Sequence, residues 1–152
     1  MITLTRATDM LLMIRGLEKL YDQCIERVRT DYHLSHMEIK IISFLYNNPG
    51  KDTAADIADL RMLPKGNISR AVESLIKKDL LYRMPDQADR RKIHLGLKDS
   101  VKSMIEDIDD AKKEYEQKIF QGISKEDLEF YFKINNKILS NVLDGLEREK
   151  NE

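Results

Sequence analysis

Tryptophan is absent from this chain, and cysteine, proline and glycine are scarce: one Cys, three Pro and six Gly among 152 residues. The single cysteine, Cys24, excludes an internal disulfide framework. So few prolines and glycines exclude a disordered or linker-rich chain. No apolar run approaches the roughly eighteen residues of a membrane span, and the run from Met10 to Ile14 is too short for a secretory signal. These absences predict a soluble cytoplasmic protein with no membrane partner.

The residues that are present fit a helical domain. Hydrophobic residues make up 41% of the chain and charged residues 35%. The first fraction is enough for a packed core, and the second is typical of long helices with solvated faces and not of a β-sandwich. A chain of 152 residues fits a single domain that spans residues 1–152.

Positive charge is concentrated in one segment. Residues 61–98 hold ten Lys and Arg against four Asp and Glu, a net charge of +6, whereas residues 1–60 carry −2 and residues 99–152 carry −5. A basic block between two acidic segments is what a localised polyanion site looks like. An ordinary solvated face that happens to be basic has the same composition, so charge alone leaves both interpretations open.

The spacing of apolar residues predicts a mainly α chain with one hairpin. Helices are expected at residues 9–32, 35–47, 53–60 and 64–78, followed by two more within 98–148. Leu80–Met84 and Lys92–Leu97 are predicted strands on either side of a polar turn. Three small helices and a two-stranded wing define a winged helix-turn-helix. We therefore expect a mainly α (α+β) fold, with the winged helix-turn-helix over residues 35–97.

Three local signals mark helix starts. Ser35 with Glu38, and Thr53 with Asp56, have the spacing of a capping box, in which each side chain bonds the backbone N–H of the other residue. Pro64 is expected at the first position of the fourth helix, where its missing N–H costs nothing.

The outer segments, residues 1–34 and 98–152, carry apolar stripes at opposite ends of the chain. A winged helix-turn-helix is too small to cover both stripes, and each would be exposed in a monomer. We expect these segments to form a helical dimerisation part, so that the protein is a homodimer.

The fourth helix is the candidate recognition helix. If Ile68 and Leu75 are buried, its polar residues turn outward near the helix end that usually enters the major groove. An arginine there suits guanine and an asparagine suits adenine. The candidate DNA contacts are Lys65, Asn67, Ser69, Arg70, Ser74 and Lys77. Taken alone, the pattern also fits an ordinary surface helix.

The hairpin tip carries the second set of candidate DNA contacts: Asp89, Arg90, Arg91 and Lys92. An arginine on a narrow hairpin has the right shape to enter a minor groove, whose negative potential attracts it. Asp89 is placed to orient a neighbouring guanidinium through a bidentate pair. The alternative is a solvated turn.

Four aromatic residues near the helix junctions, Tyr21, Tyr32, Phe44 and Tyr46, are the candidate lining of a ligand cleft. At helical spacing such residues are more often part of the core, and that alternative stays open.

No enzyme, metal or cofactor site is expected. His33 and His36 lack the second cluster of ligands that a metal site needs. The sequence has no apparent Ser/His/Asp set, glycine-rich phosphate loop or carboxylate pair that would indicate catalysis.

The stretch Ser69–Leu80, the wing sequence Asp89-Arg90-Arg91 and the order and lengths of the outer helices resemble the MarR family of bacterial transcriptional regulators. The resemblance spans nearly the whole chain. It implies a homodimer on a pseudo-palindromic operator, with Arg91 in the minor groove, Asp89 steadying it, and a small-molecule effector tuning the DNA affinity. Three positions depart from the expected pattern, and one of them is Gly66, a poor helix former near the start of the recognition helix. Asp79 stands where a glycine usually forms a left-handed helix exit, and Gly96 stands where a threonine is common.

The sequence therefore predicts a sequence-specific DNA-binding transcriptional regulator, a repressor that acts as a homodimer. The alternative is a winged-helix module for protein–protein assembly without a specific DNA site. Basic residues on both the recognition helix and the wing favour DNA.

Overall fold

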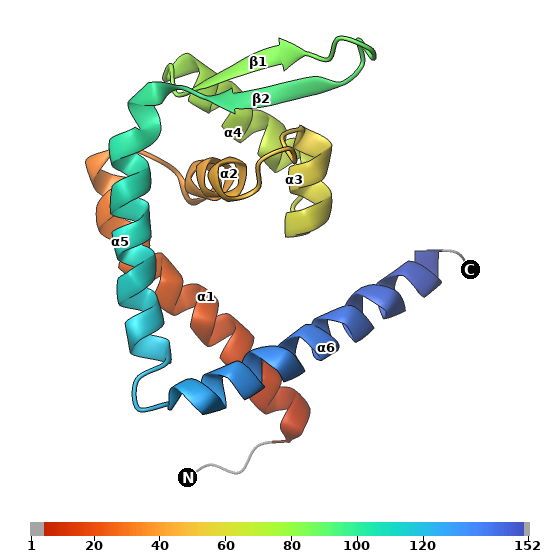
Figure 1. Cartoon of the computed structure of the whole chain (residues 1–152). Helices are drawn as coiled ribbons and strands as arrows, with labels where there is room; N and C mark the ends of the chain where they lie inside the picture. The colour runs from red at the N-terminus through yellow and green to blue at the C-terminus, as the bar shows by residue number, and fades with distance from the viewer. Residues whose placement is uncertain (1–4, 151–152) are drawn as a thin grey trace. The chain divides into compact units, whose positions relative to one another are not determined.

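The computed structural model describes residues 5–150 (Figure 1). Its elements are α1 (Arg6–Asp31), α2 (His36–Asn47), α3 (Ala54–Arg61), α4 (Lys65–Lys77), β1 (Leu81–Pro85), β2 (Ile93–Leu97), the short 3₁₀ helix η1 (Asp99–Val101), α5 (Lys102–Ile119) and α6 (Lys125–Lys150). The predicted mainly α fold with a winged helix-turn-helix is confirmed. The chain divides after Tyr115 into two units, which are described separately. Within residues 5–150 no helix is both long and apolar enough to cross a membrane.

The core of the first unit lies where α2, α3 and α4 meet beneath the hairpin (Figure 1). Branched apolar side chains fill it, and the fully buried ones include Ile39, Ile42, Ile57, Ile68 and Leu75. Ile25 of α1 and Ile108 of α5 join the same cluster. Each such side chain contributes about 1.5–3 kcal/mol when removed from water. This packing holds α4 firmly while leaving its opposite face exposed.

The predicted helix starts are largely confirmed, with one correction. Thr53 and Asp56 form a complete capping box, with N···O distances of 3.1 and 3.2 Å. The Ser35 hydroxyl accepts a hydrogen bond from the Glu38 N–H, but the Glu38 carboxylate does not return to Ser35 and is engaged elsewhere. The Pro64 prediction is one position early, because Pro64 is the N-cap and α4 begins at Lys65.

The hairpin is antiparallel, with Leu81 opposite Leu97 and Pro85 opposite Ile93. Two positions, one in the hairpin and one just before it, differ from the family that the sequence resembles, and the structure shows the conformation of each. A Cβ at position 96 would collide with the Tyr82 ring across the ladder, so Gly96 makes room for that ring. Asp79 adopts the left-handed conformation with φ of 59°, as the sequence predicts.

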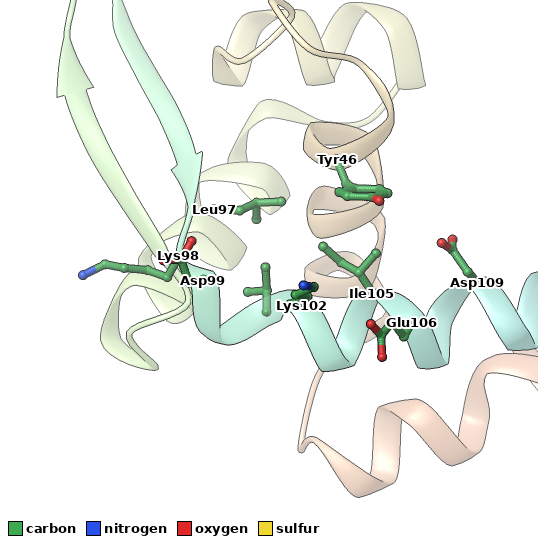
Figure 2. Close-up of a pocket in the computed structure, with 9 residues that line it drawn as sticks. Tyr46, Leu97, Lys98, Asp99, Lys102, Ile105, Glu106 and Asp109 are labelled. Carbon is green, nitrogen blue, oxygen red and sulfur yellow. The ribbon is translucent and has the colours of Figure 1, made fainter.

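The first turn after the hairpin borders a cavity. Leu97 and Ile105 face Tyr46 of α2, and Val101 joins them in lining a cavity of about 630 Å³ (Figure 2). Its rim carries charges of both signs, among them Lys102 and Asp109.

The expectation that the α1 stripe is exposed is wrong for its second half. Cys24, Ile25 and Val28 are buried within the first unit. The first half does expose its apolar residues: Met10 to Ile14 are each 45–65% accessible. The sequence pattern identifies the apolar face of α1 but not that α2 and α5 cover part of it.

The second unit contains α6, which has no buried residue. Large apolar side chains are exposed along its length: Phe130, Tyr131, Phe132, Ile134, Ile138, Leu139, Val142, Leu143 and Leu146. An apolar surface this extended is characteristic of an interaction face.

Candidate nucleic-acid interface

The outer face of α4 carries only part of the predicted contact set. Ser69, Arg70 and Lys77 are exposed, opposite the buried side of the helix. Lys65, at the start of the helix, is exposed as well. Asn67 is half-buried, and its side-chain oxygen accepts a hydrogen bond of 2.6 Å from the Arg70 guanidinium. The two side chains expected to read bases are therefore joined to each other in the DNA-free protein.

Ser74 does not point outward as predicted. It is half-buried, and its hydroxyl donates a hydrogen bond of 2.9 Å to the Glu38 carboxylate of α2. The other oxygen of this carboxylate accepts from the Lys78 ammonium at 2.7 Å. Lys78 also donates to the carbonyl of His33 at 2.7 Å. Ser74 thus belongs to the packing of α4 against α2.

The Glu38 carboxylate is a buried charge, because the residue is only 5% exposed. Removing a carboxylate from water is costly unless it is paired and hydrogen-bonded, and here both oxygens have partners. These bonds fix the C-terminal half of α4 relative to α2.

We predict that Glu38→Ala lowers the free energy of unfolding by about 2–3 kcal/mol, measured by urea denaturation. The variant removes the acceptor of the Ser74 hydroxyl and leaves Lys78 with only the His33 carbonyl. The expected loss is below that of a fully buried pair because the Lys78 side chain is 34% exposed. Glu18→Ala is the matched control, since Glu18 forms only an exposed pair with Arg15 and its loss should change stability by less than about 0.5 kcal/mol. Equal stability of the two variants would contradict the role of Glu38.

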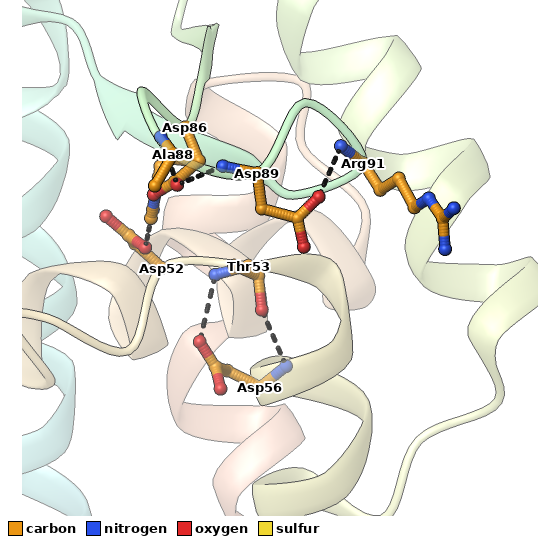
Figure 3. A network of polar contacts seen from close by, with 8 residues as sticks. Asp52, Thr53, Asp56, Asp86, Ala88, Asp89 and Arg91 are labelled. Carbon is orange, nitrogen blue, oxygen red and sulfur yellow. Dashed lines mark hydrogen bonds and ion pairs between the residues drawn. The ribbon is translucent and has the colours of Figure 1, made fainter.

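Backbone hydrogen bonds to two aspartates shape the wing tip (Figure 3). The Asp86 carboxylate accepts from the N–H groups of Ala88 and Asp89 at 3.0 and 2.9 Å. Asp89 accepts from the backbone N–H of Arg91 at 3.0 Å. The sequence predicts a bidentate pair between Asp89 and a neighbouring guanidinium, but the guanidinium of Arg91 extends away from Asp89 (Figure 3). Asp89 therefore sets the backbone from which Arg91 projects.

A contact between the wing and α4 was missed by the sequence analysis. Arg83 of β1 forms an ion pair with Glu73, which lies on the exposed side of α4. Glu73 lies within the Ser69–Leu80 stretch, but no sequence pattern pairs it with Arg83, and their proximity arises only when the hairpin folds back over α4. This pair links the two candidate DNA-binding elements.

Ion pairing separates the basic residues of segment 61–98 into two groups. Lys78, Arg83 and Lys98 have carboxylate partners. The other basic residues of this segment have no ion-pair partner among residues 5–150. They are Arg61 and every basic residue of the predicted interface: Lys65, Arg70, Lys77, Arg90, Arg91 and Lys92. The wing residues 89–92 are all exposed. The positive charge of both elements is thus left available for a polyanion.

Residues 33–92, which contain α2 to α4 and the wing tip, match the model of the MarR family. The match to the MarR family covers the winged helix, 60 of the 152 residues. The resemblance drawn from the sequence is therefore confirmed. A comparison with curated protein sequences gives no match.

Solved structures of MarR-family regulators share the fold. A MarR-family regulator from Silicibacter pomeroyi is 18% identical with a TM-score of 0.74, over 86% of this chain and 87% of that one. MepR of S. aureus, in a complex with DNA, is 23% identical with a TM-score of 0.74, over 91% and 99%. BpsR of Bordetella bronchiseptica, whose DNA binding is regulated by 6-hydroxynicotinic acid, is 17% identical with a TM-score of 0.68, over 86% and 98%. These TM-scores show that this chain shares the fold of the three solved structures.

The four aromatic residues of the predicted ligand cleft are not gathered in one place. Tyr21 and Phe44 line a cavity of about 550 Å³ between α1, α2, α3 and α5. Tyr46 borders the other cavity, shown in Figure 2. The Tyr32 hydroxyl donates to Asp107 at 2.6 Å, which raises the pKa of Tyr32.

The cavity at Tyr21, here called the α1–α2 cleft, is basic. Lys40, Arg61 and Lys112 line it, and burial raises the pKa of the Tyr21 phenol. The Ser43 hydroxyl, also in its lining, is buried and has no hydrogen-bond partner among residues 5–150. Such a lining suits a small anion with an apolar ring.

His33 and His36, the two histidines considered as metal ligands, contact other groups of the protein. His36 lies 3.5 Å from Asp22, and the His33 carbonyl accepts from Lys78. In the part of the chain that the structure describes, no three His, Cys, Asp or Glu side chains come together as a metal site.

Proposed function

We propose that this chain is a sequence-specific DNA-binding transcriptional regulator. The observation that carries this proposal is the set of basic side chains on α4 and the wing that have no carboxylate partner among residues 5–150. Unpaired cations on two adjacent elements provide the charge that displaces counterions from a DNA backbone. The structure of MepR with DNA supports the same use of the fold.

The two elements have different parts in this proposal. Helix α4 enters the major groove, where Arg70 forks onto guanine and Asn67 pairs with adenine once their mutual hydrogen bond opens. The wing enters the adjacent minor groove through Arg91. Lys65, Lys77 and Lys92 contact phosphates and position the protein without reading sequence.

We further propose that the regulator is a homodimer that acts as a repressor on a pseudo-palindromic operator. The exposed apolar face of α6 and the exposed start of α1 supply the dimer interface. A two-fold dimer places two α4 helices on half-sites about one helical turn apart. Repression follows when the dimer occupies a promoter.

A gel-shift assay with the promoter DNA that adjoins its own gene tests this function. Binding should exceed that to a scrambled duplex of equal length by roughly 10³-fold at physiological salt. Equal, weak binding to both duplexes would favour the alternative, a winged-helix module for protein–protein assembly.

We also propose that a small-molecule effector binds in the α1–α2 cleft. Lys40, Arg61 and Lys112 supply cations for a carboxylate, and Tyr21 and Phe44 supply apolar surface for a ring. The regulation of BpsR by 6-hydroxynicotinic acid supports this class of ligand.

We predict that 6-hydroxynicotinic acid binds in this cleft and that Lys112→Ala weakens its binding by about tenfold in calorimetric titration. Lys113→Ala is the matched control, because Lys113 is the next residue along α5 and pairs with Asp110 outside the cleft. No heat of binding to the wild type, or equal affinities for the two variants, would contradict the ligand assignment.

A further inference from the structure

His94 of β2 lies between two carboxylates that come from different parts of the first unit. Its Nδ1 is 2.6 Å from an Asp52 oxygen, and its Nε2 is 2.7 Å from an Asp86 oxygen. Asp52 precedes the N-cap of α3, and Asp86 begins the wing tip. The His94 side chain is only 23% exposed, so water competes weakly for these contacts. In Figure 3 Asp86 lies above Asp52 at the left of the network.

These contacts require a charged imidazole ring. An ionised carboxylate only accepts hydrogen bonds, so both ring nitrogens must donate. Neutral histidine has a single N–H, and its other nitrogen would direct a lone pair at a carboxylate oxygen. The arrangement is therefore complete only when His94 is the imidazolium.

The network extends from His94 to the wing tip through Asp86. One Asp86 oxygen faces His94, while the other holds the N–H groups of Ala88 and Asp89. Asp89 in turn holds the N–H of Arg91. On the other side, the Asp52 carbonyl accepts from the Leu95 N–H at 2.8 Å. His94 thus sits at the junction between the wing tip and the loop before α3.

We infer that His94 is a positioning residue for the wing: its imidazolium holds the wing tip against the loop before α3, and loss of the proton releases it. The effect on DNA affinity rests on the proposed function, in which Arg91 contacts the minor groove. The structure of the wing tip itself does not depend on DNA.

The charges around His94 set the direction of its pH response. The hydrogen bond to Asp52 and then that to Asp86 raise the pKa of His94 above its ordinary value, against the effect of burial. The His94 hydrogen bond, followed by those from the backbone of Asp89 and Ala88, lowers the pKa of Asp86 to about 2, so Asp86 stays ionised.

The groups near His94 do not reverse the upward shift of its pKa. Across the hairpin the partner of His94 is Met84, which is uncharged. At Asp56, burial acts to raise the pKa, but the Thr53 hydrogen bonds and then the charges of Lys51 and Lys92 outweigh it and lower the pKa. We call the contacts of His94 with Asp52 and Asp86 the clamp. Because the His94 pKa is raised, the clamp is complete below the ordinary histidine pKa and is lost as pH rises through the raised value.

The inference predicts that binding to the promoter DNA weakens by roughly three- to tenfold between about pH 6 and about pH 9. His94→Gln, which carries no charge, should bind less tightly at the lower pH by the same factor and show little dependence on pH. His36→Gln is the matched control and should keep the wild-type dependence, because His36 lies on α2 beside Asp22. If His94→Gln retained wild-type affinity at both pH values, the inference would be overturned.

Nuclear magnetic resonance of the free wild-type protein tests the clamp without DNA. The His94 ring should titrate above the ordinary histidine pKa, and the amide signals of Ala88, Asp89 and Arg91 should shift with the same midpoint. A His94 ring that titrates at its ordinary value, or amide signals that ignore its titration, would overturn the inference. If the amides follow His94 but no duplex is bound at either pH, the clamp stands and the proposed function fails.

Discussion

Leu139→Glu in α6 is expected to convert the protein to a monomer and to lower its affinity for operator DNA by at least about 100-fold. Leu139 lies near the middle of the exposed apolar face of α6 and is 50% exposed in the single chain. In a dimer formed through this face, the glutamate would be buried without a partner, which costs several kcal/mol. A monomer binds one half-site only and loses the effective concentration that links two half-sites, a factor of roughly 10²–10⁴.

The same variant should leave the fold of each chain intact. Helix α6 buries none of its residues within the chain, so the substitution removes no intramolecular packing of a buried side chain. Light scattering at micromolar concentration measures the change from dimer to monomer, and a gel-shift assay with the promoter duplex measures the loss of affinity.

Ser140→Glu is the control for Leu139→Glu. It adds the same charge at the next residue, which in a helix points about 100° away and lies on the side opposite the apolar residues. Ser140→Glu should remain a dimer that binds DNA as the wild type does. A dimeric Leu139→Glu protein would exclude this face of α6 from the interface.

Local sequence signals predicted much of the fold because their physics is local. The Thr53–Asp56 capping box spans four residues and forms as expected. The left-handed conformation at Asp79 follows from its place at the end of a helix before a strand. The hairpin strands follow from alternation and from the polar turn between them. In each case the residues that decide the structure are neighbours in the chain.

Contacts between distant residues could not be predicted in the same way. Ser74 and Lys78 meet Glu38 across 36 and 40 positions, and His94 meets Asp52 across 42. The sequence showed Ser74 as one more polar residue on α4, because helical periodicity does not say which neighbouring side chain is within reach. The same limit explains why the four aromatic residues of the predicted ligand cleft lie in different places.

Arg91→Ala is expected to weaken operator binding by about 1–3 kcal/mol, or roughly 5- to 150-fold. The Arg91 side chain is exposed at the wing tip and has no ion-pair partner among residues 5–150, so its charge is available to the DNA. Its backbone is held by Asp89 and so is already oriented for the groove. The variant should also reduce the salt dependence of binding, because one cation fewer displaces counterions. Operator affinity measured at two salt concentrations gives both quantities.

Three further variants separate the roles of the neighbouring residues. Asp89→Ala should weaken binding less than Arg91→Ala, because Asp89 shapes the turn and touches no phosphate. Arg70→Ala should relax the preference between base pairs, since α4 reads base edges and the wing reads groove shape. Lys98→Ala is the matched charge control: it lies in the same basic segment but pairs with Asp79, and its loss should leave the salt dependence unchanged.

The comparison of Arg91→Ala with Lys98→Ala decides whether the wing takes part in DNA binding. Both variants remove one positive charge from the segment with a net charge of +6, so a non-specific effect of net charge would change their binding equally. A minor-groove contact would change only Arg91→Ala, and it would do so most at low salt, where fewer ions screen the contact. If Arg91→Ala binds like the wild type at both salt concentrations, the wing tip is a solvated turn, and sequence recognition must then come from α4 alone.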